Sequence, residues 1–223
     1  MKHSKRYETI KKNKGEYGIK EGVEFVLNGC SCKFDESIDV SFNLNLQKKH
    51  SIRDTVVFPH AFGKTVRVLV FARGSKAEDA RAAGADYVGD DDLIQKIADG
   101  WVDFDVAIAT PEMMKSIAKV ARILGTKGLM PNPKAKTVTE DVLQAVKAVK
   151  AGRRECRADA AGIINFSIGK KSMSAEALME NFDALYTVIT KKKPSDLKGD
   201  YIRSVHITST MGKSVKIGKK NFK

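Results

Sequence analysis

The chain has 223 residues, enough for one large domain or two small ones, and 42% of them are hydrophobic, which is sufficient for a core. No apolar run approaches the roughly 20 residues of a membrane-spanning helix, and none follows the basic residues 1–7, so we expect no membrane segment and no secretory signal. Forty Lys and Arg against 27 Asp and Glu give a net charge of +13, which attracts polyanions unless it serves solubility alone.

The three cysteines, Cys30, Cys32 and Cys156, provide no disulfide framework, because their number is odd and only two lie close together. A zinc site needs about four ligands, and the four histidines are scattered singly along the chain. We therefore expect reduced, packed thiols, no metal site and no cofactor. Reduced thiols are typical of the cytoplasm, which is the location that we predict.

In chain order, the first clear element is a strand at 37–46, where polar and apolar residues alternate with period two. Such alternation predicts one face against a core and one face in water. Residues 56–63 follow without a regular pattern and contain Pro59, so we interpret them as a crossing between domains.

Residues 64–151 alternate between strand and helix patterns. Continuous apolar runs at 66–72 and 104–110 predict strands that are buried on both faces. Helices are predicted at 75–83 with a capping box of Ser75 and Glu78, at 90–98, after Pro111, and from an N-cap at Thr139 to Gly152. This order predicts a parallel sheet with right-handed crossovers.

After residue 152 the pattern changes again. Alternating strands are predicted at 163–168 and 201–210, and an amphipathic helix at 176–190. Because the strands at 37–46 and 163–168 both need partners to bury their apolar faces, we expect the two chain ends to fold together rather than as separate modules.

The predicted fold class is therefore a two-domain α/β protein. A discontinuous α+β domain is expected from residues 1–63 plus 152–223, with an inserted Rossmann-like α/β domain at 64–151.

The charge is distributed unevenly between these segments. Residues 1–63 contain 11 Lys and Arg against 8 Asp and Glu, and residues 152–223 contain 15 against 7, so the two ends together carry +11. Residues 64–151 contain 14 against 12 and carry only +2. The discontinuous domain is thus the expected polyanion binder.

The basic residues of the chain ends stand beside glycines, hydroxyls and one aromatic residue. Lys33 and Phe34 precede a strand, Gly169 and Lys170 follow another, and Thr208 to Lys213 end a third. Lysines neutralise phosphates, while hydroxyls and backbone amides add positioning contacts. Phe34 has two open interpretations, packing on RNA or burial in the core.

Signatures of an enzyme are absent from the sequence. The segment 64–151 has no Gly-x-Gly-x-x-Gly and no Walker loop, and the chain has no Gly-x-Ser-x-Gly. The acidic cluster Asp90 to Asp92 suits the start of a helix better than a Mg²⁺ site. We predict that the protein is not an enzyme.

Several motifs, in order along nearly the whole chain, resemble the ribosomal protein L-one family of the large-subunit stalk. They are 33–36, 57–64, 83–89, 128–134, 168–170, 203–204 and 210–212. The resemblance implies a structural constituent of the large ribosomal subunit that binds large-subunit rRNA at the mobile stalk near the exit site. It also implies release of deacylated tRNA there, repression of its own messenger RNA through an rRNA-like element, and a monomeric free protein.

The resemblance further implies RNA-binding positions. These are Glu24, Lys33, Phe34, Ser37, Ser204, Thr210, Met211 and Gly212, with further contacts from Asp159, Gly162, Gly169 and Lys170.

Four positions depart from the family pattern. The usual Asp-Lys-x-Gly turn has Ala160 in place of its lysine, and a common histidine after it is Asn165. Thr126 replaces a proline, and Lys136 stands where a glycine is expected. The first pair affects expected RNA contacts, and the second pair lies in the inserted segment.

Two other functions compete with rRNA binding. A nucleotide-dependent enzyme would need a cofactor loop in 64–151. A general single-strand binder would need several aromatic residues on one sheet, and the strands offer mainly Phe34, Phe42 and Phe166.

Overall fold

The computed structural model describes residues 15–47, 50, 52–197, 199–218 and 222, so the basic residues 1–7 lie outside the described part. The chain forms two compact units. The first contains the described residues up to Ile52, Phe58–Gly63, and those from Cys156 onward; the second contains Arg53–Val57 and Lys64–Glu155. Among the described residues, none of the helices is long and apolar enough to cross a membrane.

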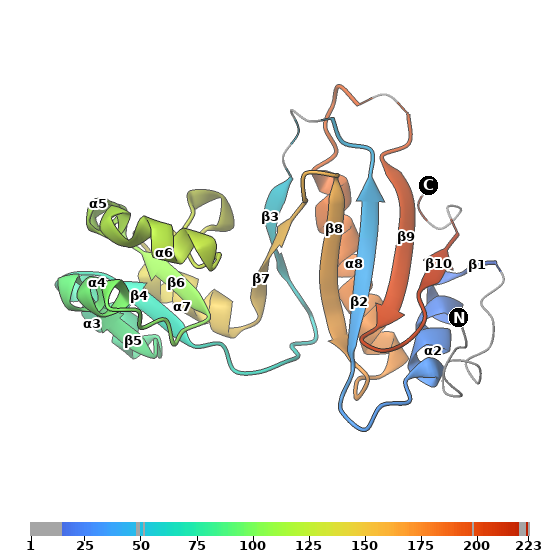
Figure 1. Cartoon of the computed structure of the whole chain (residues 1–223), viewed down its shortest axis with the longest axis horizontal. Coiled ribbons are helices and arrows are strands. Elements are labelled where there is room, and N and C mark those ends of the chain that lie inside the picture. Colours follow the sequence, from blue (N-terminus) through green and yellow to red (C-terminus); the bar gives the residue numbers. More distant parts are fainter. Residues whose placement is uncertain (1–14, 48–49, 51, 198, 219–221, 223) are drawn as a thin grey trace. The chain divides into compact units, whose positions relative to one another are not determined.

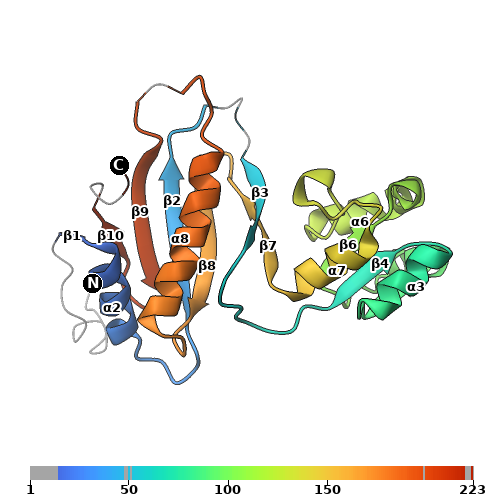
Figure 2. The same ribbon diagram turned by 180° about the vertical axis from the view of Figure 1, so that it is seen from behind.

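The first unit is a five-stranded sheet with helices on one face (Figures 1 and 2). Its strand order is β1 (Glu16–Tyr17), β10 (Val215–Ile217), β9 (Ile202–Ser209), β2 (Ser37–Leu44) and β8 (Ile163–Lys170). Only β1 and β10 pair in parallel. The helices are α2 (Ile19–Gly29) and α8 (Ala175–Lys191). Both chain ends thus contribute strands to one sheet.

The alternating pattern decides which side of this sheet forms the core. Along β2 every second residue from Ile38 to Leu44 is buried, and the ring of Phe42 lies 5.7 Å from that of Phe182 on α8. The predicted strands and the amphipathic helix at 176–190 are confirmed, whereas α2 and β10 were not predicted. A Cβ at Gly22 of α2 would lie 2.5 Å from Ile217, so glycine permits close packing of this helix on β10.

The second unit is a three-layer structure around a parallel sheet of order β5 (Tyr87–Gly89), β4 (Val68–Phe71) and β6 (Val106–Ala109). One face carries α3 (Ser75–Ala82) and α7 (Val142–Lys150). The other carries α4 (Asp91–Ala98), α5 (Met114–Ile117) and α6 (Ala121–Thr126). The predicted parallel sheet is confirmed. Helices cover both of its faces, which explains why its strands are apolar on both sides.

Three local predictions in this unit are wrong. The N-cap of α3 is Gly74 without a side-chain cap, so Ser75 and Glu78 form no capping box. The N-cap of α7 is Asp141, whose Oδ1 accepts from Gln144 N, whereas Thr139 accepts from Asp141 N upstream of the helix. The helical segment does begin at Pro111, but it is not one continuous helix: the 3-10 turn η1 (Pro111–Met113) precedes α5, and a second turn, η2 (Ala118–Val120), separates α5 from α6.

A two-stranded sheet of β3 (Arg53–Val57) and β7 (Arg153–Arg157) was also missed. Neither strand has a full period-two apolar pattern, so the sequence did not indicate a strand at either position.

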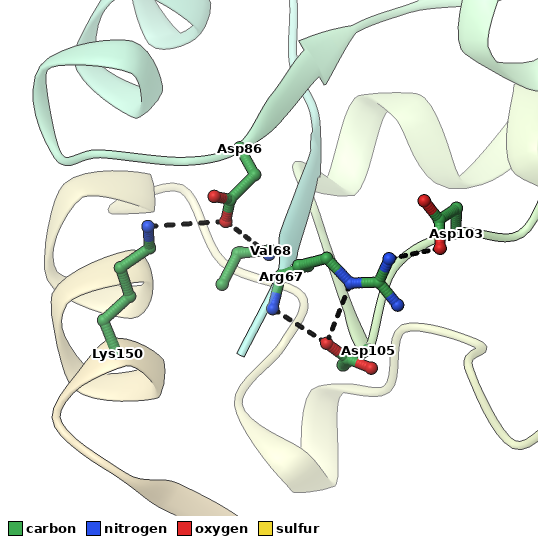
Figure 3. Close-up of polar contacts among 6 residues, drawn as sticks. All are labelled: Arg67, Val68, Asp86, Asp103, Asp105 and Lys150. Carbon is green, nitrogen blue, oxygen red and sulfur yellow. Dashed lines mark hydrogen bonds and ion pairs between the residues drawn. The ribbon is translucent and has the colours of Figure 1, made fainter. Parts of the chain in front are cut away.

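Charged side chains at one edge of the second unit are paired with one another (Figure 3). The Arg67 guanidinium contacts Asp103 and donates from Nε to Asp105 at 3.4 Å. Asp86 accepts from Val68 N at 2.9 Å and lies 3.4 Å from Lys150 Nζ. The hydrogen bond that the Arg67 backbone amide donates to Asp105 lowers the pKa of this carboxyl group. These carboxylates secure the start of β4 and leave little free charge there.

Candidate nucleic-acid interface

The face of the first sheet opposite the helices is polar. Rows of polar side chains, half-buried except for the exposed Asn165, run across β2, β8 and β9. The strand registers place them side by side: Ser37, Asp39, Ser41 and Asn43 on β2, Asn165 and Ser167 on β8, Ser204, His206 and Thr208 on β9. Ser41 Oγ donates to Asn165 Oδ1 at 2.6 Å. Neither α2 nor α8, the helices described in the first unit, covers this face (Figure 1).

Two large apolar side chains are exposed at one end of this face. Phe34, just before β2, is 51% exposed, and Met211, just after β9, is 57% exposed. The open question about Phe34 is thus settled against core burial. Phe42 is in the core and Phe166 packs on Phe58, so the sheet does not present the several exposed aromatics that a general single-strand binder needs.

Glu36 joins the two loops that carry these apolar side chains. Its side chain is fully buried; Oε1 accepts from Cys32 N at 3.0 Å and Oε2 accepts from Met211 N at 3.1 Å. Burial opposes ionisation, but the hydrogen bonds donated to the carboxylate outweigh it and lower the pKa of Glu36. The carboxylate therefore stays charged and fixes residues 32–36 against residues 209–212.

The structural role of Glu36 was missed in the sequence, although a signal existed. Glu36 has the same parity as Ile38, Val40 and Phe42, so the period-two pattern already placed it on the buried side. A carboxylate on that side requires donors.

A second set of bonds ties Ser37 to the end of β9. Ser37 N donates to Thr210 Oγ1 at 2.9 Å, and Thr210 N donates to Ser37 O at 3.0 Å. Lys170 Nζ, at the end of β8, donates to Ser37 Oγ at 2.8 Å. Three strand ends thus meet at Ser37, whose backbone bonds to Thr210 and whose hydroxyl holds the Lys170 ammonium group.

The turn after β8 holds the Phe34 loop from its other side. Ser172 donates from N and from Oγ to the Asp35 carboxylate, both at 3.0 Å, and Lys171 Nζ donates to Cys30 O at 3.0 Å. Lys33 and Phe34 remain exposed at the tip. We call residues 32–37, 170–172 and 209–212 the Phe34–Met211 edge.

Gly212 is required by packing. A Cβ at this position would lie 2.3 Å from Ser209 Oγ, and Ser209 is only 2% exposed. A Cβ at this position would have to displace the Ser209 hydroxyl, so glycine permits the close approach of the Met211 loop to the end of β9.

The other predicted positions lie elsewhere in the first unit. Ser204 pairs with Asn43, which pairs with Ile163 next to the Asp159–Gly162 turn. This row is six residues along β2 from Ser37, or roughly 20 Å at the usual rise of a strand.

Asp159 and Gly162 shape that turn. Asp159 Oδ1 accepts from Ala161 N at 2.9 Å and from Ile163 N at 2.7 Å. Gly162 has φ +82°, and a Cβ there would lie 2.9 Å from Leu44 O. Both residues thus serve the backbone, and Ala160 and Ala161 form its exposed tip.

Two predicted contact residues are not at the edge surface. Gly169 is buried and pairs with Ile38, and a Cβ there would lie 2.3 Å from Leu178 of α8. It permits α8 to pack closely. Glu24 has an exposed side chain on α2, which packs on the opposite face of the sheet from the polar rows.

The described residues bring together no metal-binding group of three or more His, Cys, Asp or Glu. Burial raises the pKa of the Cys30 thiol, which therefore stays protonated near neutral pH. The polar sheet face thus ends in the exposed side chains of Lys33, Phe34 and Met211.

Comparison with known proteins identifies the class. Residues 26–213 match the Ribosomal protein L1p/L10e family. The chain is similar to the large ribosomal subunit protein uL1 of Borrelia duttonii (strain Ly), with 53% identity over 90% of each chain. It is 50% identical to the protein of the same name from Borreliella burgdorferi (strain ATCC 35210 / DSM 4680 / CIP 102532 / B31), over 97% of this chain and 95% of the relative.

The chain therefore belongs to the Ribosomal protein L1p/L10e family. This confirms three predictions: the family resemblance, a structural rather than enzymatic protein, and a place of action at the ribosome. The mixed α/β fold class is also confirmed.

Proposed function

We propose that this protein is a constituent of the large ribosomal subunit that binds large-subunit rRNA through the Phe34–Met211 edge and the adjoining polar face of the sheet. The observation that carries this proposal is the buried, ionised Glu36, which holds two exposed apolar side chains in one preformed surface. Preformed loops bind without an ordering cost. The names of the curated relatives support the assignment to the large subunit.

The chemistry of the edge suits structured RNA. The wide minor groove of RNA offers riboses and 2′-hydroxyls, which apolar side chains and hydroxyls can contact, and Lys33 and Lys170 neutralise neighbouring phosphates. The Ser204 row and the Asp159–Gly162 turn form a second contact region along the same face. In that region Ala160 offers no positive charge, so backbone and hydroxyl groups would make the contacts with RNA.

The finer functions implied by the family resemblance are part of this proposal. The site is the mobile stalk near the exit site, where the protein assists release of deacylated tRNA. Free protein, as a monomer, represses its own messenger by binding an rRNA-like element with the same edge. We also propose the domain division 1–63 plus 152–223 and 64–151, with the discontinuous domain as the RNA binder, which the +11 charge of the chain ends supports.

The test is binding of the full chain to a stalk rRNA fragment, and to the leader of its own messenger, with a scrambled RNA as the control. We expect Met211→Asp to abolish both specific interactions together. If Met211→Asp leaves rRNA affinity unchanged, the edge is not the binding surface. If it abolishes rRNA binding only, the proposed repression uses a different surface or does not occur.

A further inference from the structure

A groove in the second unit lies beside α7 and the short 3-10 turn η3 (Pro133–Ala135). Its volume is about 660 Å³, within the usual range for small-ligand sites. Its lining combines apolar Val138, Ala145 and Ala148 with the cations Lys136, Lys147 and Arg153, and with one carboxylate, Asp141. Because the Asp141 Oδ1 atom caps α7 by accepting from Gln144 N, the cations outnumber the free acceptors in the groove.

Arg153 is the first sign of a ligand. Its Nε is buried and has no hydrogen-bond partner among the described residues, and the side chain also lines a second hollow of about 330 Å³. Arg53, Arg67 and Arg73 of the same unit each pair with a carboxylate. A buried guanidinium donor without an acceptor is costly, so its retention indicates an anionic ligand as the acceptor.

Lys136 is the second and independent sign. In the described part of the chain it is the only non-glycine residue with a positive φ, 53°. A glycine adopts this left-handed conformation without strain, and the family pattern has a glycine here. A lysine that keeps the strained conformation indicates that its ammonium group is used.

The charges of Lys136 and Lys147 are available for binding. Both side chains are exposed, and within the described residues neither has an ion pair. By contrast, Lys150, at the end of the same helix α7, is bound to Asp86.

We propose that this groove binds the phosphate group of a phosphate ester. Lys136 and Lys147 neutralise the phosphate, Arg153 donates to a phosphate oxygen, and Val138 and Ala145 contact the organic part of the ester. Phosphate groups are commonly bound by guanidinium groups, which donate hydrogen bonds in a fixed geometry, and by ammonium groups, which act as point charges. The proposal is independent of rRNA binding by the first unit.

The test is titration of the ¹⁵N-labelled full chain, followed by NMR, with inorganic phosphate, AMP and a short unstructured RNA. We expect saturable shifts of the backbone amides of Lys136, Lys147 and Arg153. Removal of one charged partner weakens binding about tenfold, so the Kd should rise by that factor in Lys136→Gln. Lys134→Gln removes a neighbouring charge that does not line the groove and should leave the Kd within about twofold.

A second variant separates binding from folding. Lys136→Gly removes the ammonium and relieves the backbone strain, so the folded state should be at least as stable while the Kd still rises about tenfold. Shifts with phosphate and AMP would assign the site to small phosphate esters, and shifts with RNA alone would assign it to an RNA backbone. The proposal is overturned if no ligand shifts these amides saturably, or if both Lys136 variants bind like the wild type.

Discussion

The sheet edge of the second unit and the Phe34–Met211 edge of the first unit treat charge in opposite ways. In the second unit, Arg67 and Lys150 are matched with aspartates at the sheet edge (Figure 3). Arg73 is likewise paired with Asp90 at the start of α4. In the first unit, the Phe34–Met211 edge places lysines beside exposed apolar side chains, and its one buried carboxylate accepts from backbone amides. Paired charges stabilise the second unit locally, whereas charges left without a carboxylate remain available to a polyanion.

The largest expected effect is on rRNA affinity. It tests whether an exposed apolar side chain contributes to rRNA binding in the first unit but not in the second. Met211→Asp places a negative charge at the edge and should lower rRNA affinity by about 100-fold or more, or roughly 2.7 kcal/mol. Val57→Asp is the matched control, because Val57 is 52% exposed but belongs to the second unit. Filter binding measures both, and equal losses would contradict the comparison.

The next effect concerns the stability of the edge. Glu36→Ala leaves the amides of Cys32 and Met211 without their acceptors and should cost about 2–4 kcal/mol of the free energy of unfolding. Urea unfolding of the full chain measures this loss, and Asp39→Ala on the open face is the control, expected within about 0.5 kcal/mol.

The same residue gives a pH dependence. Because the folded-state pKa of Glu36 is lowered from its ordinary value of 4.5, its stabilising contribution is complete above that pH and is lost as the pH falls through the folded pKa. The difference in unfolding free energy between wild type and Glu36→Gln should therefore shrink below about pH 4.5. A difference that does not change between pH 7 and pH 3 would show that the buried carboxylate does not act through its charge.

A smaller effect tests the shape of the edge. Gly212→Ala forces a Cβ against Ser209 Oγ and should destabilise the first unit by about 1–3 kcal/mol and weaken rRNA binding. Adding Ser209→Ala removes the clashing oxygen and should restore part of both losses. Thermal unfolding and Kd values of the four proteins in this cycle check the prediction, and additive losses would refute the steric cause.

The smallest effect on affinity tests the free charges. Lys33→Gln should reduce the slope of log K against log salt concentration by about 1 and weaken binding only a few-fold. Lys115→Gln removes an equally exposed charge from the second unit and should leave the slope unchanged. If the slope changes equally in both variants, rRNA affinity depends on the net charge of the protein and not on the position of Lys33 at the edge.

The alternating pattern predicted where basic residues stand beside strands, whereas the individual RNA-binding positions were implied by the family resemblance. The strand at 37–46 placed Ser37 on the open face, and the motif 210–212 followed another alternating strand. The pattern could not decide whether Phe34 is buried, since that depends on the Glu36 bonds and on the turn at Ser172, 138 residues away in the chain.

What the sequence determined by itself was local: period-two strands, the apolar strands of the parallel sheet, the amphipathic stripe of α8, the segregation of positive charge to the chain ends and the order of the family motifs. Only the tertiary structure decided what depends on distant partners. It made Glu36 a buried acceptor, turned Gly169 and Gly22 into packing positions, paired β3 with β7, and moved the cap of α7 from Thr139 to Asp141. The physical reason is that burial and hydrogen-bond satisfaction are set by neighbours in space, which period and propensity do not specify.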